Sequence, residues 1–309
     1  MTARVRYKIR NWADYNQSLI NRGNLTIWFD DDVVQAWNAV RPNGRRGRDQ
    51  TFSDIAIECA LTLRRLFRLP LRQTQGLLDG LFTLLKVPLT APYYTTLSRR
   101  ADGLGADLQA LPQSGPINLV VDGTGLKIYG EGEWKMRTHG KGKRRTWRKL
   151  HLGINRESHE IVAITLTESN VHDSMQTGAL LSQVARVDTV TGDKGYDNCN
   201  AYGPIAAAGA RAIIPPRSGA ALKTKNISWG DVERNRLLHE QHLLGKTEWK
   251  TASRYSRRSL VETAIGRYKA ILGAGLRSRR MATQITEAKI GAKILNRMTH
   301  LGMPKSYKI

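Results

Sequence analysis

The chain has 309 residues, enough for one large domain or two ordinary ones, and it is strongly basic. It carries 49 Lys and Arg against 26 Asp and Glu, a formal net charge of +23, which predicts a polyanionic partner. No stretch approaches the roughly 18 consecutive apolar residues of a membrane-spanning helix, and the N-terminal segment lacks the apolar region of a signal peptide. We therefore expect a cytoplasmic protein that binds neither a membrane nor a small-molecule substrate.

The two cysteines, Cys59 and Cys199, lie far apart and without Cys-x-x-Cys spacing. This pattern argues against a disulfide framework and against structural zinc. Both are expected to be small buried residues.

The first third of the sequence predicts mainly helices. Acidic residues 30–32 can start a short helix, and Ser53 can cap another whose apolar face would hold Ile55, Cys59, Leu63 and Leu66. Between them, residues 41–49 combine two glycines with four arginines, and either lie along phosphates or form a solvated linker. We predict a helical DNA-binding region over residues 1–115.

Residues 70–104 of that region resemble a helix-turn-helix. Leucines at helical spacing predict a helix over 71–86, the sequence VPLTAP interrupts it, and a second helix restarts over 93–104. As a recognition helix, the second one would bring Arg99 and Arg100 to phosphates or base edges. The alternative is an ordinary helical hairpin with a charged outer face.

Residues 116–309 predict an α/β domain, because short apolar strands alternate with helices. The expected elements are a strand over 118–121, a hairpin of 147–155 with 159–168, a helix over 174–185, a strand over 187–193, a helix over 201–208 and a strand over 211–216. This order fits an RNase H-like mixed sheet with flanking helices. A further insertion is predicted over 217–254, where Trp229 and Trp249 are local core or a base-stacking patch, and His239 and His242 are surface residues.

Two predicted strands stop at an acid, Asp122 and Asp193, which lie 71 positions apart. Neighbouring strands would bring both carboxylates to one metal ion, and oxygen ligands suit Mg²⁺ or Mn²⁺. Gly123, Gly192 and Gly195 would allow a DNA backbone to come close. Taken singly, each Asp could instead be a turn former before a glycine.

A third carboxylate is expected from the segment 255–269. Tyr255, Arg258, Glu262 and Lys269 are spaced three, four and seven residues apart, so all four can share one helix face. A metal ligand with flanking cations is what phosphodiester chemistry needs. The alternative is a surface salt-bridge ladder.

Four ordered blocks resemble the DDE transposases of bacterial insertion sequences, in the group with the pattern Tyr-x2-Arg-x3-Glu-x6-Lys. The blocks are LPLRQTQGLLDGL with TTLSRR, VVDGTGLKIYGEGEW around Asp122, HDS with GDKGYD around Asp193, and the 255–269 segment. The resemblance implies cleavage at the terminal inverted repeats and strand transfer into target DNA, with Mg²⁺ and without a covalent protein–DNA intermediate. Asp122, Asp193 and Glu262 would hold two ions, and joining two element ends requires at least a homodimer. A bacterial, nucleoid-associated location follows.

Further residues are expected to contact DNA. The basic run 135–149, with Lys143, Arg144, Arg145 and Arg148, either lines the DNA channel or forms a nonspecific tail. His172 and Lys194 lie one or two positions from acids, and Lys127 is assigned by resemblance only. Two other functions stay open: a DNA-binding repressor or inactive remnant, and a structure-specific nuclease on the same core.

Overall fold

The computed structural model describes residues 7–39, 51–104, 115–128 and 147–309. The chain divides into two compact units, one made of Met1–Ala106 with Lys293–Ile309 and the other of Asp107–Ala292. The predicted arm at 41–49 lies outside the described residues, as do Lys143, Arg144 and Arg145. No helix in the described ranges is both long and apolar enough to cross a membrane.

The first unit is mainly helical. Its elements are β1 Tyr7–Ile9, α1 Trp12–Asn21, η1 Leu25–Ile27, α2 Asp31–Gln35, α3 Asp54–Leu66, α4 Leu71–Leu85, α5 Tyr94–Arg100, the last part of α12 Met281–Leu301, and β8 Ser306–Lys308. β1 and β8 pair antiparallel. As predicted, Ser53 caps α3, since its hydroxyl accepts a hydrogen bond from the Ala56 amide.

An aromatic cluster forms the core of this unit. The Trp37 ring lies 5.1 Å from the Phe82 ring and 5.9 Å from the Phe29 ring, both edge-on. The predicted apolar faces are partly wrong, because Ile55 is 49% exposed and Leu84 is 82% exposed. The covered stripe of α3 is rotated from the predicted one and includes Ala56, Cys59, Ala60 and Leu63.

The connection between α4 and α5 spans residues 86–93, longer than the three- or four-residue turn typical of a helix-turn-helix. Arg100 does not extend into solvent. Its guanidinium donates to the Phe52 carbonyl at 2.9 Å and to the Asp54 carboxylate at 2.5 Å. Arg100 therefore ties α5 to the start of α3, whereas Arg99 is exposed, and the DNA contact of each residue stays a prediction.

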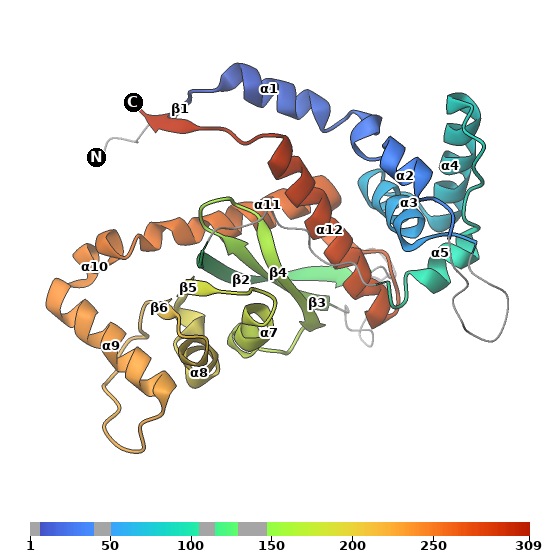
Figure 1. Cartoon of the computed structure of the whole chain (residues 1–309). Helices are drawn as coiled ribbons and strands as arrows, with labels where there is room; N and C mark the ends of the chain where they lie inside the picture. Colours follow the sequence, from blue (N-terminus) through green and yellow to red (C-terminus); the bar gives the residue numbers. More distant parts are fainter. Residues whose placement is uncertain (1–6, 40–50, 105–114, 129–146) are drawn as a thin grey trace, which may run out of the picture. The chain divides into compact units, whose positions relative to one another are not determined.

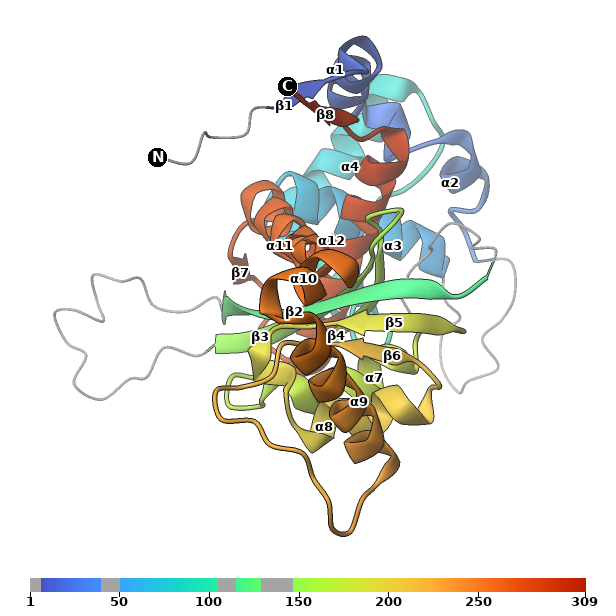
Figure 2. The same ribbon diagram turned by 90° about the vertical axis from the view of Figure 1, so that its left-hand side faces the viewer.

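The second unit is built on a mixed sheet. Its strands are β2 Ile117–Ile128, β3 Trp147–Asn155, β4 Ile161–Glu168, β5 Val187–Thr191 and β6 Arg211–Ile213, in the order β4-β3-β2-β5-β6 (Figure 2). β3 runs antiparallel to both of its neighbours, β2 and β4, and β5 and β6 run parallel to β2. The short strand β7 Gly275–Leu276 pairs in parallel with the C-terminal end of β2, at Lys127 and Ile128. This is the RNase H-like mixed sheet expected from the sequence.

Helices cover both faces of the sheet (Figure 1). On one face lie η2 Asp173–Gln176, α7 Thr177–Leu181 and α8 Cys199–Ala207, and on the other lies α11 Ser259–Leu272. Side chains alternate along β2, so Leu119 and Val121 join the core under α7 and α8. Val120 and Asp122 therefore face α11.

Three predicted boundaries differ from the structure. β2 does not end at Asp122 but pairs with β3 as far as Lys127. The helix expected over 174–185 is shorter and divided into η2 and α7. The segment before Glu262 begins with the 3₁₀ turn η4 Tyr255–Arg258, and only then continues as α11.

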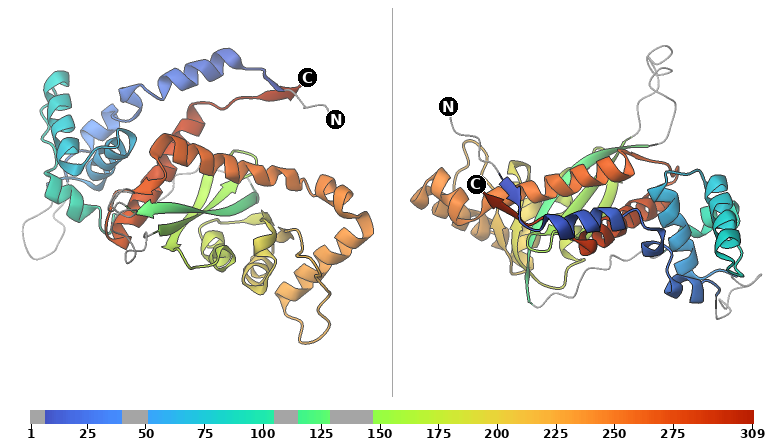
Figure 3. Two further views of the ribbon diagram at one scale, coloured as in Figure 1. Left: turned by 180° about the vertical axis from the view of Figure 1, so that it is seen from behind. Right: turned by 90° about the horizontal axis from the view of Figure 1, so that it is seen from above.

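The region 217–254 contains two helices, α9 Trp229–Leu244 and α10 Lys246–Ala252. α9 starts with a capping box formed by Ser228 and Asp231, and packs against α8 and β6 (Figure 3). Trp249 is buried in the core of the second unit, while Trp229 is 83% exposed. Local core is thus the correct interpretation for Trp249.

Candidate active site

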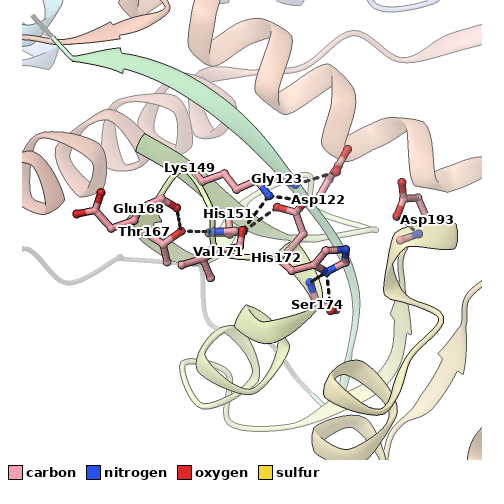
Figure 4. A network of polar contacts seen from close by, with 12 residues as sticks. Asp122, Gly123, Lys149, His151, Thr167, Glu168, Val171, His172, Ser174 and Asp193 are labelled. Carbon is pink, nitrogen blue, oxygen red and sulfur yellow. Dashed lines mark hydrogen bonds and ion pairs between the residues drawn. The ribbon is translucent and has the colours of Figure 1, made fainter. Parts of the chain in front are cut away.

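The register of the parallel strands β2 and β5 places Asp122 and Asp193 at equivalent positions along the two strands. The two strands run parallel, with Val120 opposite Thr191, and each acid lies two residues further along its own strand direction. β5 ends at Thr191, so Asp193 lies on the loop beyond the strand, while Asp122 stays within β2. Figure 4 draws both side chains. Each carboxylate accepts one backbone hydrogen bond at 2.8 Å, Asp122 from Gly123 and Asp193 from Gly195.

Arg258 connects the third acid to the first. Its Nη2 lies 2.5 Å from Glu262 Oε1, and its Nη1 lies 3.9 Å from Asp122 Oδ2. The Glu262 side chain is 51% exposed and the Asp122 side chain 22%. Arg258 and Glu262 contact each other, as their i, i+4 spacing allows, and through Arg258 the segment lies near Asp122 on β2.

The pKa of Tyr255 is affected by all three acids. Burial raises the pKa of its hydroxyl, the carboxylates of Asp193, Glu262 and Asp122 raise it further, and Arg258 opposes them. The Tyr255 ring itself packs against Trp249, with 5.8 Å between ring centroids. The charges of Asp122, Asp193 and Glu262 all act on this one hydroxyl, although the three residues are distant in sequence.

This region carries more negative charge than its neighbours offset. Burial raises the pKa of Asp122, and the carboxylates of Asp193 and Asp173 add to the rise, although the Gly123 amide and Arg258 act against it. Oxygen donors with surplus negative charge fit a hard divalent cation. Within the described ranges, no three acidic, histidine or cysteine side chains converge closely enough to enclose an ion, and Arg258 holds Glu262 instead.

A fourth carboxylate, Asp173, lies against β2 at Gly123, the residue after Asp122. Lys149 Nζ is 3.2 Å from Asp173 Oδ2, and His151 Nδ1 is 3.2 Å from Asp173 Oδ1. The fully buried His151 also bonds Thr167 Oγ1 through Nε2, at 2.8 Å. Burial tends to raise the pKa of Asp173, but His151 and Lys149 lower it overall.

Gly123 makes this packing possible. A Cβ atom at position 123 would lie 2.0 Å from Asp173 Oδ1, so any other residue would displace either the strand or the carboxylate. The sequence interpretation missed Asp173, Lys149 and His151. Two signals for this network were present in the sequence: the HDS segment at 172–174, and the basic residues Lys149 and His151 at alternate positions of a predicted strand. The sequence interpretation used the HDS segment only to select His172.

The remaining residues that the sequence predicts to contact DNA near the acids differ in exposure and in the groups they contact. Lys127 is exposed on β2, with its Nζ 5.7 Å from the Trp147 ring centroid. Strand alternation puts its side chain on the sheet face opposite to that of Asp122. His172 caps η2 through Nδ1, which lies 2.8 Å from Ser174 Oγ. Lys194 is exposed, and Lys269 lies half-buried on α11.

Arg148, a predicted DNA contact, is bonded within the second unit. Its Nε donates to Gln284 at 2.9 Å and its Nη1 to Glu168 at 2.5 Å, with 12% of the side chain exposed. The guanidinium thus fastens β3 to β4 and α12, and its DNA contact stays a prediction.

Comparison with known proteins identifies the family. Two family models described as transposase DDE domains match the chain, one over residues 20–131 and the other over residues 113–296. The second match covers more than half of the 309 residues. The chain belongs to the DDE transposase family. It is accordingly a DDE transposase enzyme, and divalent metal ions are general to that family.

A solved structure is also similar over much of the chain. The cryo-EM structure of a piggyBac transposase synaptic complex with hairpin DNA matches with a TM-score of 0.40 and 11% sequence identity. The match covers 92% of this chain and 75% of that one.

Proposed function

We propose that this DDE transposase binds the terminal inverted repeats of its element, cleaves the DNA there and joins the freed end to target DNA. Asp122, Asp193 and Glu262 are the proposed metal ligands. The observation that carries the proposal is the grouping of these carboxylates around Tyr255 and Arg258, with too little positive charge to offset them.

Carboxylate oxygens are ligands that suit Mg²⁺ or Mn²⁺. In the proposed arrangement Asp122, Asp193 and Glu262 would together hold two such ions, once Glu262 releases Arg258. Such ions, when bound, activate water or a 3′-hydroxyl as the nucleophile and stabilise the leaving oxygen. In the chemistry, water attacks phosphorus and the bond to the 3′-oxygen breaks, which leaves a 3′-hydroxyl to attack the target strand.

The protein's own cations position the DNA in this proposal. Arg258 and Lys269 on the α11 segment, and Lys194 beside Asp193, would hold phosphates on either side of the scissile bond. Arg258 is bonded to Glu262, so it competes with a cation for that carboxylate. On the opposite sheet face, Asp173, Lys149 and His151 would keep the Asp122 segment of β2 in place.

The domain assignment also belongs to the proposal. Residues 1–115 would recognise the inverted repeats, with Arg99 still available as a contact, and residues 116–309 would carry out the chemistry. The net charge of +23 supports a duplex partner. Pairing two ends in one complex calls for a dimer or higher oligomer on DNA.

The deciding experiment compares Asp122→Asn with Asp188→Asn, an exposed carboxylate on β5 of the same sheet. Both proteins are assayed for gel shift and for Mg²⁺-dependent nicking of DNA that carries the sequence flanking the reading frame. We expect Asp122→Asn to bind this DNA but not nick it, and Asp188→Asn to do both. Nicking by Asp122→Asn at the wild-type rate would end the assignment.

The wild-type protein in the same assay separates the alternative functions. Binding without any metal-dependent cutting would indicate a repressor or an inactive remnant. Cutting of branched DNA without preference for the flanking sequence, and without joining, would indicate a structure-specific nuclease.

A further inference from the structure

A cavity lies between the 215–222 loop and the helices α9 and α10. Its volume is about 910 Å³, and its walls come from that loop, from the second half of α9, from Lys246 at the start of α10 and from Lys194. It is within the size range of cavities that hold small ligands, ~300–1,000 Å³. None of the assigned metal ligands lines it.

The lining of the cavity is cationic. Lys194, Arg217 and Lys246 contribute positive charge, His239 and His242 contribute ring nitrogens, and none of the lining residues is Asp or Glu. Uncompensated positive charge in a concave site attracts an anion and repels a metal ion. The i, i+3 histidine pair is therefore better suited to hydrogen bonding with an anion than to metal binding.

The loop wall is held rigidly, as a preformed site requires. Arg217 donates from its guanidinium to the carbonyls of Lys194 and Gly195, at 3.3 and 3.2 Å. Its amide donates to Asp197 at 2.8 Å, and Arg234 bonds both Asp197 and the Ala221 carbonyl. Arg217 is thus occupied in building the wall, which leaves the lysines and histidines to face a ligand.

The cavity adjoins the acid site. Lys194 follows Asp193 directly, and consecutive Cα atoms are only about 3.8 Å apart. The Asp193 carboxylate turns back to the Gly195 amide, while Lys194 is one of the residues that line the cavity. The cavity therefore begins at the residue after Asp193, beside an acid that the proposed function places at the scissile phosphate.

Apolar and amide groups complete the lining. Leu222 and Leu238 offer surfaces for a flat base, and Gln241 offers an amide that can bond a base edge. We propose that this cavity binds unpaired nucleotides of the DNA strand that flanks the cleavage position, with their phosphates on Lys194 and Lys246. The inference rests on the proposed function, because it takes the acid site as the point of cleavage.

The test measures binding rather than cleavage. Fluorescence anisotropy, with EDTA present and at one fixed salt concentration, compares a labelled inverted-repeat duplex that is blunt with the same duplex carrying a four-nucleotide single-stranded flank. The proteins are the wild type, Lys246→Ala, Lys246→Arg, His242→Ala and the control Lys225→Ala. Lys225 is an exposed lysine of the same region that does not line the cavity.

We expect the wild type to prefer the flanked duplex by about tenfold. Lys246→Ala and His242→Ala should lose most of that preference, with blunt-duplex affinity within about twofold, while Lys246→Arg and Lys225→Ala keep it. An equal loss in Lys225→Ala, or no preference in the wild type, overturns the cavity assignment and leaves the proposed function standing. Failure of the proposed function would show separately, as nicking by Asp122→Asn.

Discussion

Two groups of carboxylates in the second unit differ in how their charge is offset. Asp197, with 1% of its side chain exposed, receives hydrogen bonds from Arg234 on both oxygens and from the Arg217 amide. Only four residues earlier, Asp193 has a single backbone donor and shares its surroundings with Asp122. The two aspartates lie four residues apart, yet the charge of Asp197 is offset by an arginine, whereas Asp193 lies near another carboxylate.

The same contrast separates the glutamates. Glu233 on α9 is bonded by Arg236 and by the Ala212 amide, and Arg236 also bonds Glu240. Among the residues that the structure describes, the ion-pair partner of Glu262 is Arg258, which also lies near Asp122. The offset acids on α9 fix this helix to β6, whereas the under-compensated acids are those that we propose as metal ligands. Loss of an offset acid should cost stability, and loss of an under-compensated one should cost activity.

The pair Asp193 and Asp197 offers the strongest test of this contrast. Asp193→Asn should reduce Mg²⁺-dependent nicking by about 10³-fold or more, because a metal ligand contributes several kcal/mol to the transition state. Its thermal midpoint should stay at or above the wild-type value, since one member of a repelling set of charges is removed. Gel assays of nicking and a thermal melt check both parts. A melt lowered by several degrees would mean that Asp193 belongs to the scaffold.

Asp197→Asn should have the reverse effect. Removing one partner of a buried ion pair leaves Arg234 uncompensated and typically costs about 3–5 kcal/mol. We expect this loss in the free energy of unfolding measured with urea, and nicking by the remaining folded protein within a few-fold of wild type. Lys223→Ala is the control, because the Lys223 side chain is 48% exposed and its pair with Asp231 should be worth under about 1 kcal/mol. Equal stability of the two variants would contradict the contrast.

Gly123 and Asp173 test the packing beneath the acid site. In Gly123→Ala the new methyl group would collide with Asp173, shift Asp122 and slow nicking by about 10- to 100-fold. Asp173→Ser alone should slow nicking less, and adding it to Gly123→Ala should restore part of the rate because it opens space. A double-mutant cycle of nicking rates measures this coupling. Strictly additive effects would show that the two positions act independently.

Much of the second unit could be predicted from the sequence, because its strands have strong apolar patterns and the hairpin 147–168 alternates clearly. The rule that an acid follows the end of a buried strand pointed to Asp193, although β5 ends two residues earlier, at Thr191. The same rule misplaced the end of β2, since the glycines after Asp122 suggested a turn where pairing with β3 continues to Lys127. Cross-strand hydrogen bonds there outweigh the low strand preference of Gly123 and Gly125.

The network around Asp173 was beyond prediction for a different reason. It depends on the register that sets His151 opposite Gly123, and on η2 folding back under that strand. Neither relation leaves a periodic signal in the chain. For the same reason, helical spacing predicted that the leucines of α4 form a face, but did not indicate that Leu84 would stay uncovered.

The two cysteine thiols also differ in exposure to solvent, and of all the predictions theirs has the smallest effect on function. Both cysteines were predicted to be buried, but only Cys59 is, and Cys199 is exposed. Burial, together with the Asp30 and Glu58 carboxylates, raises the pKa of Cys59 to about 12, although Arg297 opposes the rise. At pH 8 almost no Cys59 thiolate exists, so iodoacetamide should modify Cys199 in the native protein at least about 100-fold faster. Peptide mass spectrometry over time follows both sites, and 6 M guanidinium serves as the control in which the rates converge. Fast native labelling of Cys59 would mean that α3 opens readily, and that the core of the first unit encloses this thiol less tightly than its burial indicates.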